Sequence, residues 1–337
     1  MPTNLSKDII ILAIESSCDD TAASVIFNGK ILSNRVASQS IHEQYGGVVP
    51  ELASRAHQQN IVPVVDVALK ESGIGLNQLS AIAFTKGPGL IGSLMVGSSF
   101  AKSLSQSLSI PLIGVHHMQA HVLAHFIDEP RPSFPFLCLT VSGGHTQIVK
   151  MNDYFEQEVL GKTIDDAAGE AFDKAAKMLG LPYPGGPLVD QYAKLGNEDA
   201  FVFPMPNIPN LDFSFSGLKT SILYFLRKQE LVNPNFIEEN LNDLCASIQK
   251  AFVKHLMKKL VMASVQTDIK QISLAGGVSA NSKLRYEIER EGKLRGWQTF
   301  IPAFAYCTDN AAMIAMAAHY KFLTKDFETI EAAPFAR

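Results

Sequence analysis

Two histidines four residues apart give this 337-residue sequence its sharpest chemical signal. In the segment His116-His117-Met118-Gln119-Ala120-His121, His117 and His121 would share one face of a helix, because residues four apart are neighbours on a helix surface. This spacing is typical of metal ligands, although two ordinary surface or core histidines of an amphipathic helix are the alternative. A zinc protease is not indicated, because its motif needs a glutamate where Met118 stands.

A polar turn between two short apolar segments occurs twice in the sequence. The first turn is Ser16-Ser17-Cys18-Asp19-Asp20-Thr21, and the second is Ser142-Gly143-Gly144-His145-Thr146. Strands are expected before and after each turn, at residues 8–15, 22–27, 136–141 and 147–151. Backbone N–H groups in such turns can form a concave nest that holds a phosphate or carboxylate, although a glycine pair alone is more often a simple turn.

A second pattern is also repeated in the same order. Residues 79–85 and 269–275 are apolar, and each run is followed by a glycine turn and a helical stretch, which is typical of a βα unit. These turns are Lys86-Gly87-Pro88-Gly89 and Gly276-Gly277-Val278-Ser279-Ala280-Asn281. The two repeats predict two similar α/β lobes, joined near residues 128–133, where Pro130 and Pro132 mark a connection.

The expected boundaries follow from these repeats and from the helical periodicity. We expect a first lobe over residues 1–130, completed by a C-terminal helix within 310–337, and a second lobe over 131–309. The second lobe should contain an insertion of irregular loops at about 180–220, where glycine and proline are frequent. Further long helices are expected at 48–71, 91–107 and 241–265.

Composition and charge limit the classes of protein to be considered. The formal net charge is −4, from 29 Lys and Arg against 33 Asp and Glu, and no basic run suggests an RNA-binding arm. The four cysteines, Cys18, Cys138, Cys245 and Cys307, are widely spaced, so neither a disulfide framework nor a thiolate zinc cluster is suggested. The apolar run at residues 9–14 is too short for a membrane span and reads as a buried strand. A reducing cytoplasm fits these features.

Taken together, the ordered motifs resemble those of the tRNA N6-adenosine threonylcarbamoyltransferase family over nearly the whole chain. The motifs are the two polar turns beginning at Glu15 and Ser142, Gly87-Pro88-Gly89, His117-Met118-Gln119-Ala120-His121, Gly169-Glu170-Ala171-Phe172-Asp173-Lys174, Pro184-Gly185-Gly186-Pro187, Phe213-Ser214-Phe215-Ser216-Gly217-Leu218-Lys219-Thr220, Gly276-Gly277-Val278-Ser279-Ala280-Asn281 and Thr308-Asp309-Asn310. The resemblance implies an α/β fold with two duplicated lobes, as in the actin, Hsp70 and sugar-kinase superfamily.

The activity that this resemblance implies is transfer of a threonylcarbamoyl group from threonylcarbamoyl-AMP to N6 of adenosine 37 in tRNAs that read codons beginning with adenine. By the same resemblance, His117, His121 and Asp309 would be catalytic residues that hold one divalent metal per subunit, either iron(II), which is expected first, or zinc(II). The donor would contact Thr140, Val141, Ser142, Gly143, Gly144, Asp173, Gly186, Asp190 and Asn281.

Each of these polar residues also has a purely structural interpretation. Asp173 could be a solvated helix charge, Gly186 a turn former, Asp190 a cap and Asn281 a helix start. His145 stays open between a substrate contact and an ordinary turn residue. The segment 213–219 is interpreted either as part of a cleft floor or RNA-facing loop, or as a packed aromatic hairpin.

The resemblance also implies partner proteins and leaves rival functions open. A smaller paralogous subunit and an ATP-hydrolysing subunit would join the chain, and no membrane is involved. A small-molecule kinase or ATPase of the same fold is one rival, and a non-catalytic scaffold is another. The helix expected at 48–71 has apolar positions that fit either packing within the first lobe or contact with a partner.

Overall fold

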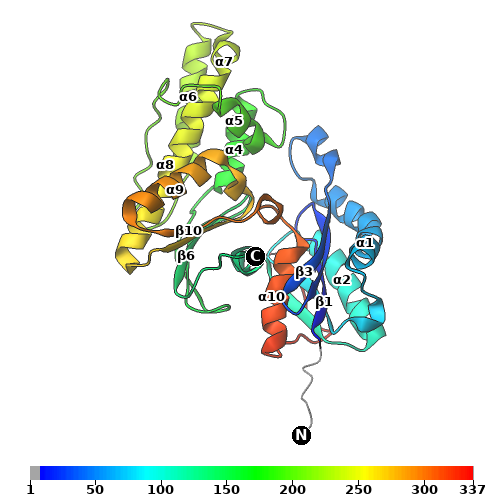
Figure 1. Ribbon diagram of the computed structural model, residues 1–337. Coiled ribbons are helices and arrows are strands. Elements are labelled where there is room, and N and C mark those ends of the chain that lie inside the picture. Colours follow the sequence, from blue (N-terminus) through cyan, green and yellow to red (C-terminus); the bar gives the residue numbers. More distant parts are fainter. Residues whose placement is uncertain (1–7, 337) are drawn as a thin grey trace. The chain divides into compact units, whose positions relative to one another are not determined.

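The computed structural model describes residues 8–336, which fold as two α/β units (Figure 1). Unit 1 comprises the described residues up to Glu129 and from Asp309 onward, and unit 2 comprises Pro130–Thr308. Residues 1–7 and 337, which the expected first lobe includes, lie outside the described residues.

Unit 1 is built on a five-stranded sheet with the strand order β3-β2-β1-β4-β5. Its strands are β1 (Ile10–Glu15), β2 (Thr21–Phe27), β3 (Lys30–Ala37), β4 (Ala81–Gly87) and β5 (Leu112–His116). The first three strands are antiparallel neighbours, whereas β1, β4 and β5 run parallel. The carboxyl ends of these three parallel strands therefore meet at one edge of the sheet, the usual place for a site in an open α/β sheet.

Helices cover both faces of this sheet. On one face lie α1 (Pro50–Ser72) and α2 (Ile91–Leu108), and on the other lie α3 (His117–Leu123) and α10 (Ala311–Leu323) (Figure 1). Three short 3₁₀ turns, η1 (Ser40–Tyr45), η2 (Leu76–Gln78) and η3 (Ala124–Phe126), complete the unit. The helices expected at 48–71 and 91–107 are confirmed, and α1 packs into the lobe through a buried stripe that includes His57, Ile61 and Val65.

The expected C-terminal helix lies within residues 310–337. Helix α10 ends at Leu323. The segment after it returns to the sheet, where Glu328 forms an antiparallel bridge with Leu112. Near the end, the Phe335 amide donates to the Lys86 carbonyl oxygen. A Cβ on Gly87 would lie 2.2 Å from the Phe335 carbonyl oxygen, so glycine is required for this approach.

Unit 2 repeats the sheet design with the strand order β10-β9-β6-β7-β8. Its strands are β6 (Phe136–Val141), β7 (Thr146–Met151), β8 (Gln157–Lys162), β9 (Gln271–Ala275) and β10 (Gln298–Phe300). Strands β6, β7 and β8 are antiparallel neighbours, whereas β9 runs parallel to β6 and to β10. In both units, therefore, a polar turn joins the first two strands in chain order.

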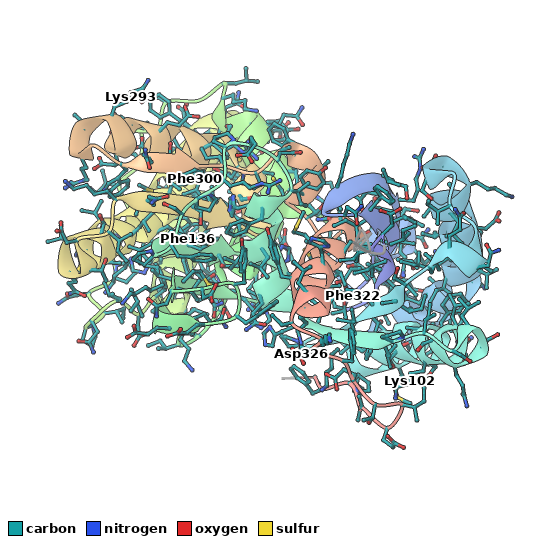
Figure 2. All side chains as sticks on the ribbon, turned by 60° about the horizontal axis from the view of Figure 1, so that its bottom comes forward. Lys102, Phe136, Lys293, Phe300, Phe322 and Asp326 are labelled. Carbon is teal, nitrogen blue, oxygen red and sulfur yellow. The ribbon has the colours of Figure 1, made fainter. Side chains whose placement is uncertain are left out.

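The helices of unit 2 lie mainly on one side of its sheet (Figure 1). They are α4 (Ala168–Met178), α5 (Gly185–Ala193), α6 (Ser216–Glu230), α7 (Phe236–Glu239), α8 (Leu241–Thr267) and α9 (Ser282–Arg295), with 3₁₀ turns η4 (Gly277–Ala280) and η5 (Phe304–Tyr306). Figure 2 shows Phe136 and Phe300 at the sheet of this unit and Lys293 on α9, where it is exposed. Helix α8 confirms the expected long helix at 241–265.

The region 180–220 is only partly the irregular segment that its composition suggested: it contains α5 and the start of α6, whereas residues 194–215 form no helix or strand. Two glycines and a proline begin α5, where their low helix propensity matters least. The Asp173 carboxylate accepts hydrogen bonds from the Gly185 and Gly186 amides at 2.9 and 3.0 Å, which satisfies two N–H groups of the first turn. A Cβ on Gly185 would lie 2.2 Å from the Cβ of Ala176, so this glycine permits close packing of α5 on α4.

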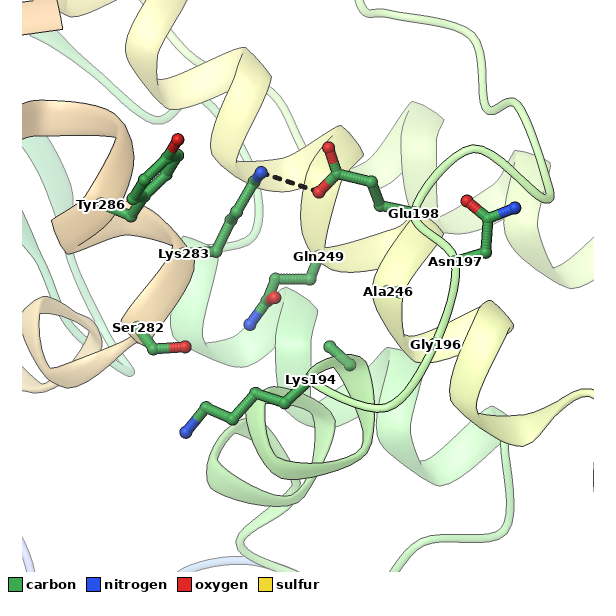
Figure 3. A pocket seen from close by; sticks show the side chains of 10 residues that line it. Lys194, Gly196, Asn197, Glu198, Ala246, Gln249, Ser282, Lys283 and Tyr286 are labelled. Atoms are coloured by element: carbon green, nitrogen blue, oxygen red, sulfur yellow. Dashed lines mark ion pairs between the residues drawn. The ribbon is translucent and has the colours of Figure 1, made fainter. Parts of the chain in front are cut away.

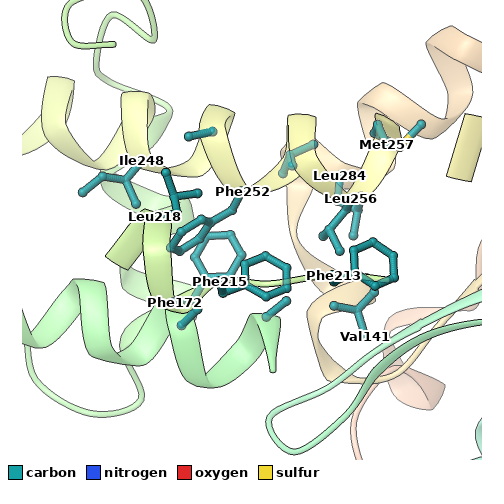
Figure 4. Packing of buried hydrophobic residues seen from close by; sticks show 14 of the residues in the cluster. Val141, Phe172, Phe213, Phe215, Leu218, Ile248, Phe252, Leu256, Met257 and Leu284 are labelled. Carbon is teal, nitrogen blue, oxygen red and sulfur yellow. The ribbon is translucent and has the colours of Figure 1, made fainter. Parts of the chain in front are cut away.

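Aromatic side chains form the centre of the unit 2 core (Figure 4). Phe252 on α8 packs perpendicular to Phe172, with ring centroids 4.8 Å apart, and also contacts Phe215. Phe213 and Phe215 are fully buried, and both rings contact His255. The burial of these two phenylalanines fits the packed aromatic interpretation of segment 213–219, although α6 begins at Ser216 and the segment is not a hairpin. The cleft-floor and RNA-facing interpretations stay predictions.

Two further features bear on the class of protein. Within residues 8–336, no helix is both long and apolar enough to cross a membrane. The cysteines Cys18, Cys138, Cys245 and Cys307 are all free thiols. The prediction that no disulfide framework holds the fold is therefore confirmed.

Candidate functional site

The histidine pair lies at the carboxyl edge of the unit 1 sheet. Strand β5 ends at His116, and α3 begins with the next residue. His117 and His121 lie one turn apart on α3, and both are almost completely buried. Their rings meet edge to face, with centroids 4.7 Å apart.

One carboxylate of the same unit faces both rings. Asp309 Oδ1 lies 3.2 Å from His121 Nε2 and 3.4 Å from His117 Nε2. The Asn310 side chain caps α10 by accepting a hydrogen bond from the Met313 amide, which fixes the backbone immediately after Asp309. One ligand atom from each of the three residues His117, His121 and Asp309 lies within 4.8 Å of the others.

A second, fully buried carboxylate lies behind His117. Glu15 is the last residue of β1, and its Oε2 atom is 3.1 Å from His117 Nδ1. The same oxygen accepts a hydrogen bond from the Thr85 hydroxyl at 2.6 Å. The other oxygen, Oε1, accepts one from the Ser17 amide at 2.5 Å, which ties the first polar turn to the end of β1.

The two carboxylates control the electrostatics of the imidazole between them. Burial by itself would lower the pKa of His117, but the negative charges of Asp309 and Glu15 outweigh burial and raise that pKa well above its usual value. Burial likewise opposes the charged forms of Asp309 and Glu15, yet the attraction of His117 holds the pKa of both carboxyl groups below the usual range. A site with one buried and one half-buried carboxylate around one imidazole therefore favours a bound positive charge.

The chemistry of these donors fits a metal ion. With His117 Nδ1–H directed at Glu15, Nε2 faces the Asp309 carboxylate, so a cation at this position, either a second proton on the ring or a metal ion, would be attracted by both groups. Two imidazole nitrogens and one carboxylate oxygen form a set that suits iron(II) or zinc(II) and leaves coordination positions for a substrate.

The remaining predicted residues lie in unit 2, and five of them, residues 140–144, form the end of β6 and the turn after it. Thr140 and Val141 are buried in β6, and Ser142, Gly143 and Gly144 form the turn after it. The Gly169 amide of α4 donates to the Ser142 carbonyl oxygen at 3.2 Å, which places the first turn of α4 beside this glycine turn. His145 takes part in the same turn through its main chain, since Ser142 and His145 exchange backbone and side-chain hydrogen bonds.

The predicted polar side chains of unit 2 all have structural partners. Asp173 caps α5, Asn281 Oδ1 caps α9 by accepting from the Leu284 amide at 3.0 Å, and Asp190 Oδ1 accepts from the Ser282 amide at 3.1 Å. The structure therefore confirms the interpretation of Asp190 as a cap and of Asn281 as a helix start. Asp173 is also a cap, and not simply a solvated helix charge. The Asn281 amide nitrogen is not used by its cap.

A cavity of about 430 Å³ lies beside Asp190, between α5, α8 and α9 (Figure 3). Asp190 Oδ1 accepts hydrogen bonds from Gln249 and Ser282, both of which line the cavity. Lys283 and Glu198 form an ion pair of 2.7 Å across it (Figure 3). Of the residues predicted to hold the donor, none lines this polar cavity, and Asp190 contacts its lining through Gln249 and Ser282.

Comparison with known proteins decides the family. The model of the family described as tRNA N6-adenosine threonylcarbamoyltransferase matches residues 30–316. The proteins of that name from Christiangramia forsetii and Porphyromonas gingivalis are 62% and 58% identical to this chain, over 95% and 99% of its length. The alignments also cover 95% and 99% of those relatives. This chain belongs to the tRNA N6-adenosine threonylcarbamoyltransferase family.

Solved structures of low sequence identity to this chain have a similar fold. The HypF protein of T. kodakarensis superposes with a TM-score of 0.62 at 13% identity, over 99% of this chain and 50% of HypF. Component A of (R)-2-hydroxyglutaryl-CoA dehydratase from Acidaminococcus fermentans gives a TM-score of 0.56 at 12% identity, over 94% of this chain and 99% of component A. The predicted α/β fold of two lobes with similar sheets is confirmed.

Sequence reasoning did not assign a role to Glu15, which lies beside the candidate metal site and accepts a hydrogen bond from Thr85. Glu15 and Thr85 each end or nearly end a parallel strand of the unit 1 sheet and hydrogen bond to each other. A charged residue at the end of a wholly apolar strand, directly before a polar turn, was the signal that could have indicated Glu15.

Proposed function

We propose that the chain transfers the threonylcarbamoyl group of threonylcarbamoyl-AMP to N6 of adenosine 37 in tRNAs that read codons beginning with adenine. The observation that carries this proposal is the 62% identity to a tRNA N6-adenosine threonylcarbamoyltransferase over 95% of both chains. The proposed site of the reaction is cytoplasmic, where bacterial tRNA is modified.

The residues of unit 1 would serve the transfer by holding one divalent metal. His117, His121 and Asp309 supply the ligands, and the 2-His-1-carboxylate set favours iron(II), with zinc(II) as the alternative. When bound, such an ion acts as a Lewis acid that polarises the carbamoyl oxygen. Because the donor is a mixed anhydride with AMP as a good leaving group, the chain needs no covalent nucleophile of its own.

The residues of unit 2 would bind the adenylate half of the donor. Amides of the turn Ser142-Gly143-Gly144 can offset negative charge that develops on the leaving phosphate. The cavity beside Asp190 offers a carboxylate, amide and hydroxyl groups, which are the groups that hold ribose hydroxyls and a base edge. Donor and acceptor would thus be oriented by fixed dipoles and not by mobile charged side chains.

A small-molecule kinase or ATPase is the rival function for this fold. Such an enzyme needs carboxylates that bind Mg²⁺, an ion that prefers oxygen ligands and water. The histidine pair beside Asp309 favours a softer metal, and this supports threonylcarbamoyl transfer over phosphoryl transfer.

Nucleoside mass analysis tests the proposed transfer directly. Unmodified tRNA is incubated with the chain, threonine, bicarbonate, ATP and a cell extract depleted of the endogenous enzyme. We expect a mass gain on adenosine that corresponds to threonylcarbamoyl addition and that depends on this chain. Phosphate release without any modified adenosine would favour the rival function.

We further propose that the chain acts with a smaller paralogous subunit and an ATP-hydrolysing subunit. Its negative net charge predicts a weak grip on tRNA by itself, because phosphate neutralisation supplies most nonspecific affinity. Unit 1 also exposes four apolar side chains on α1 and α2, namely Val62, Val67, Ile91 and Met95. Exposed apolar side chains on neighbouring helices fit a protein partner.

The expected result for the isolated chain, given tRNA and preformed donor, is little or no sustained turnover. Activity should appear when the cognate bacterial subunits are added, as measured by modified nucleoside formed per chain over time. Many rapid turnovers by the chain alone at physiological salt, with other subunits excluded by mass spectrometry, would contradict this proposal.

Conservative substitutions test whether Asp173 and Asn281 hold the donor. Asn281→Asp keeps the oxygen that caps α9 but removes the amide nitrogen, and Asp173→Asn keeps one acceptor oxygen for α5. Loss of one buried polar contact should weaken donor binding by about 1–3 kcal/mol, measured by calorimetry. Unchanged donor affinity in both folded variants would rule out this role.

A further inference from the structure

Glu15 is a buried charge whose hydrogen bonds are all made within unit 1. Its side chain is completely inaccessible to solvent, and it contacts the Ser17 amide, the Thr85 hydroxyl and His117 Nδ1. Burying a carboxylate costs several kcal/mol unless it is paired, so a buried carboxylate calls for a specific explanation. The only charged or chargeable group among these three contacts is the His117 imidazole.

All three contacts to Glu15 come from potential donors. The Ser17 amide can only donate, and a carboxylate can only accept from the Thr85 hydroxyl and from His117. His117 must therefore carry a proton on Nδ1, and Nε2, which faces Asp309, is the nitrogen at which a metal ion can replace the second proton of the imidazolium. A histidine that donates Nδ1–H to a carboxylate while Nε2 binds a metal is a recurring arrangement in metalloproteins.

His121 provides the contrast within the same site. Its Nε2 atom also faces Asp309, but its buried Nδ1 atom has no hydrogen-bond partner among the described residues. The ring of His121 is therefore placed by packing and by its contact with Asp309, whereas His117 also has a charged neighbour at Nδ1, which sets its ring orientation and tautomer.

We propose that Glu15 is a positioning residue that fixes His117 in the Nδ1–H tautomer and thereby orients its Nε2 atom as a metal ligand. This inference rests on the proposed metal site of His117, His121 and Asp309. Glu15 touches neither the ion nor the substrate. Its negative charge also strengthens the electron donation of the imidazole to the ion.

Replacing Glu15 with glutamine should reverse the tautomer of His117, with almost no change in the size of the side chain at position 15. Glutamine has one acceptor oxygen, which the Ser17 amide requires, and it would then present its NH₂ group toward Thr85 and His117. The hydroxyl of Thr85 can accept this donor, but His117 can do so only with a lone pair on Nδ1. The ring would then carry its proton on Nε2, where it blocks metal binding.

The test is zinc(II) affinity of the purified full chain, measured by competition with a chelator of known affinity. We expect Glu15→Gln to weaken zinc binding by about 10–100-fold, with Glu15→Asp between it and the native chain, because aspartate keeps the charge but is shorter. The matched control is Thr85→Val, which removes another hydrogen bond to the same Glu15 oxygen and should change zinc affinity less than about threefold.

A long-range ¹H–¹⁵N histidine spectrum of the zinc-loaded chain supplies a readout that a merely structural role would not move. We expect His117 to show a protonated Nδ1 in the native chain and in Thr85→Val, and to lose this signature in Glu15→Gln. Equal zinc affinity in the native chain, Glu15→Asp and Glu15→Gln would overturn the inference. Retention of zinc by the His117, His121 and Asp309 triple alanine variant would instead overturn the metal site itself.

Discussion

Asp309→Ala is expected to remove bound metal and threonylcarbamoyl transfer together, each by roughly 100-fold or more. Asp309 Oδ1 is the oxygen that both His117 Nε2 and His121 Nε2 face. Loss of a partner outside the ligand set already costs about 10–100-fold in affinity or activity, so loss of a ligand should reach at least the upper end of that range. The same direction is expected for alanine at either histidine.

Metal content by mass spectrometry and modified nucleoside per tRNA are the two measurements for this variant. Asp326→Ala is the matched control, because Asp326 is an exposed carboxylate of the same unit that pairs only with Lys321 among the ion pairs of the described residues (Figure 2). Both quantities should stay near native values in the control. A triple alanine variant that keeps one metal per chain and full transfer would place the site elsewhere.

Phe252→Ala is expected to lower the free energy of unfolding of unit 2 by about 3–5 kcal/mol. The Phe252 ring is fully buried and packs perpendicular to Phe172 and Phe215, so its removal leaves a cavity between three helices and the aromatic cluster (Figure 4). The surrounding side chains come from separate elements and cannot all collapse into the space.

The sequence contains a convenient probe for this measurement. Trp297 is the single tryptophan, lies in unit 2 and is 8% exposed, so its fluorescence during denaturant unfolding reports this unit. Tyr224→Ala is the control on α6, because the Tyr224 side chain is 65% exposed and should contribute little. Identical unfolding midpoints for Phe252→Ala and Tyr224→Ala would contradict the expected cost of the cavity.

Periodic segments of the sequence predicted their elements well. Five elements lie within a few residues of their expected ranges, namely α1, α2, α8, β1 and β6. Apolar residues recur with the period of a helix in the three helices and form a continuous run in the two strands. Helix α5 was not predicted, since its first turn contains Gly185, Gly186 and Pro187. Its stability depends on the Asp173 carboxylate, which belongs to another helix and is invisible to a local pattern.

The candidate site also depends on contacts between residues that are far apart in the sequence. The four-residue spacing of His117 and His121 is local, so the sequence could indicate it directly. Glu15 lies 102 positions from His117, and only the parallel pairing of β1 and β4 and of β4 and β5 brings their strand ends to one edge. For Asp190 and Asn281, the capping role and the proposed donor contact could not be separated from the sequence either, because capping and ligand binding call for the same polar side chains.

The separation of the proposed ligands along the chain has a consequence for biosynthesis. His121 and Asp309 are 188 positions apart, and the whole of unit 2 lies between them. All five strands of the unit 1 sheet are made before unit 2 begins, whereas Asp309 and α10 are made after it.

At about 5–20 residues per second, roughly 10–40 s of translation separate the second ligand from the third. During this interval the nascent chain carries an imidazole pair without the carboxylate that completes the set. An ion held by all three side chains can therefore be acquired only after the ribosome has passed residue 309. Incomplete chains that end within unit 2 would lack such an ion. Metal content would therefore distinguish full-length chains from chains whose synthesis stopped within unit 2.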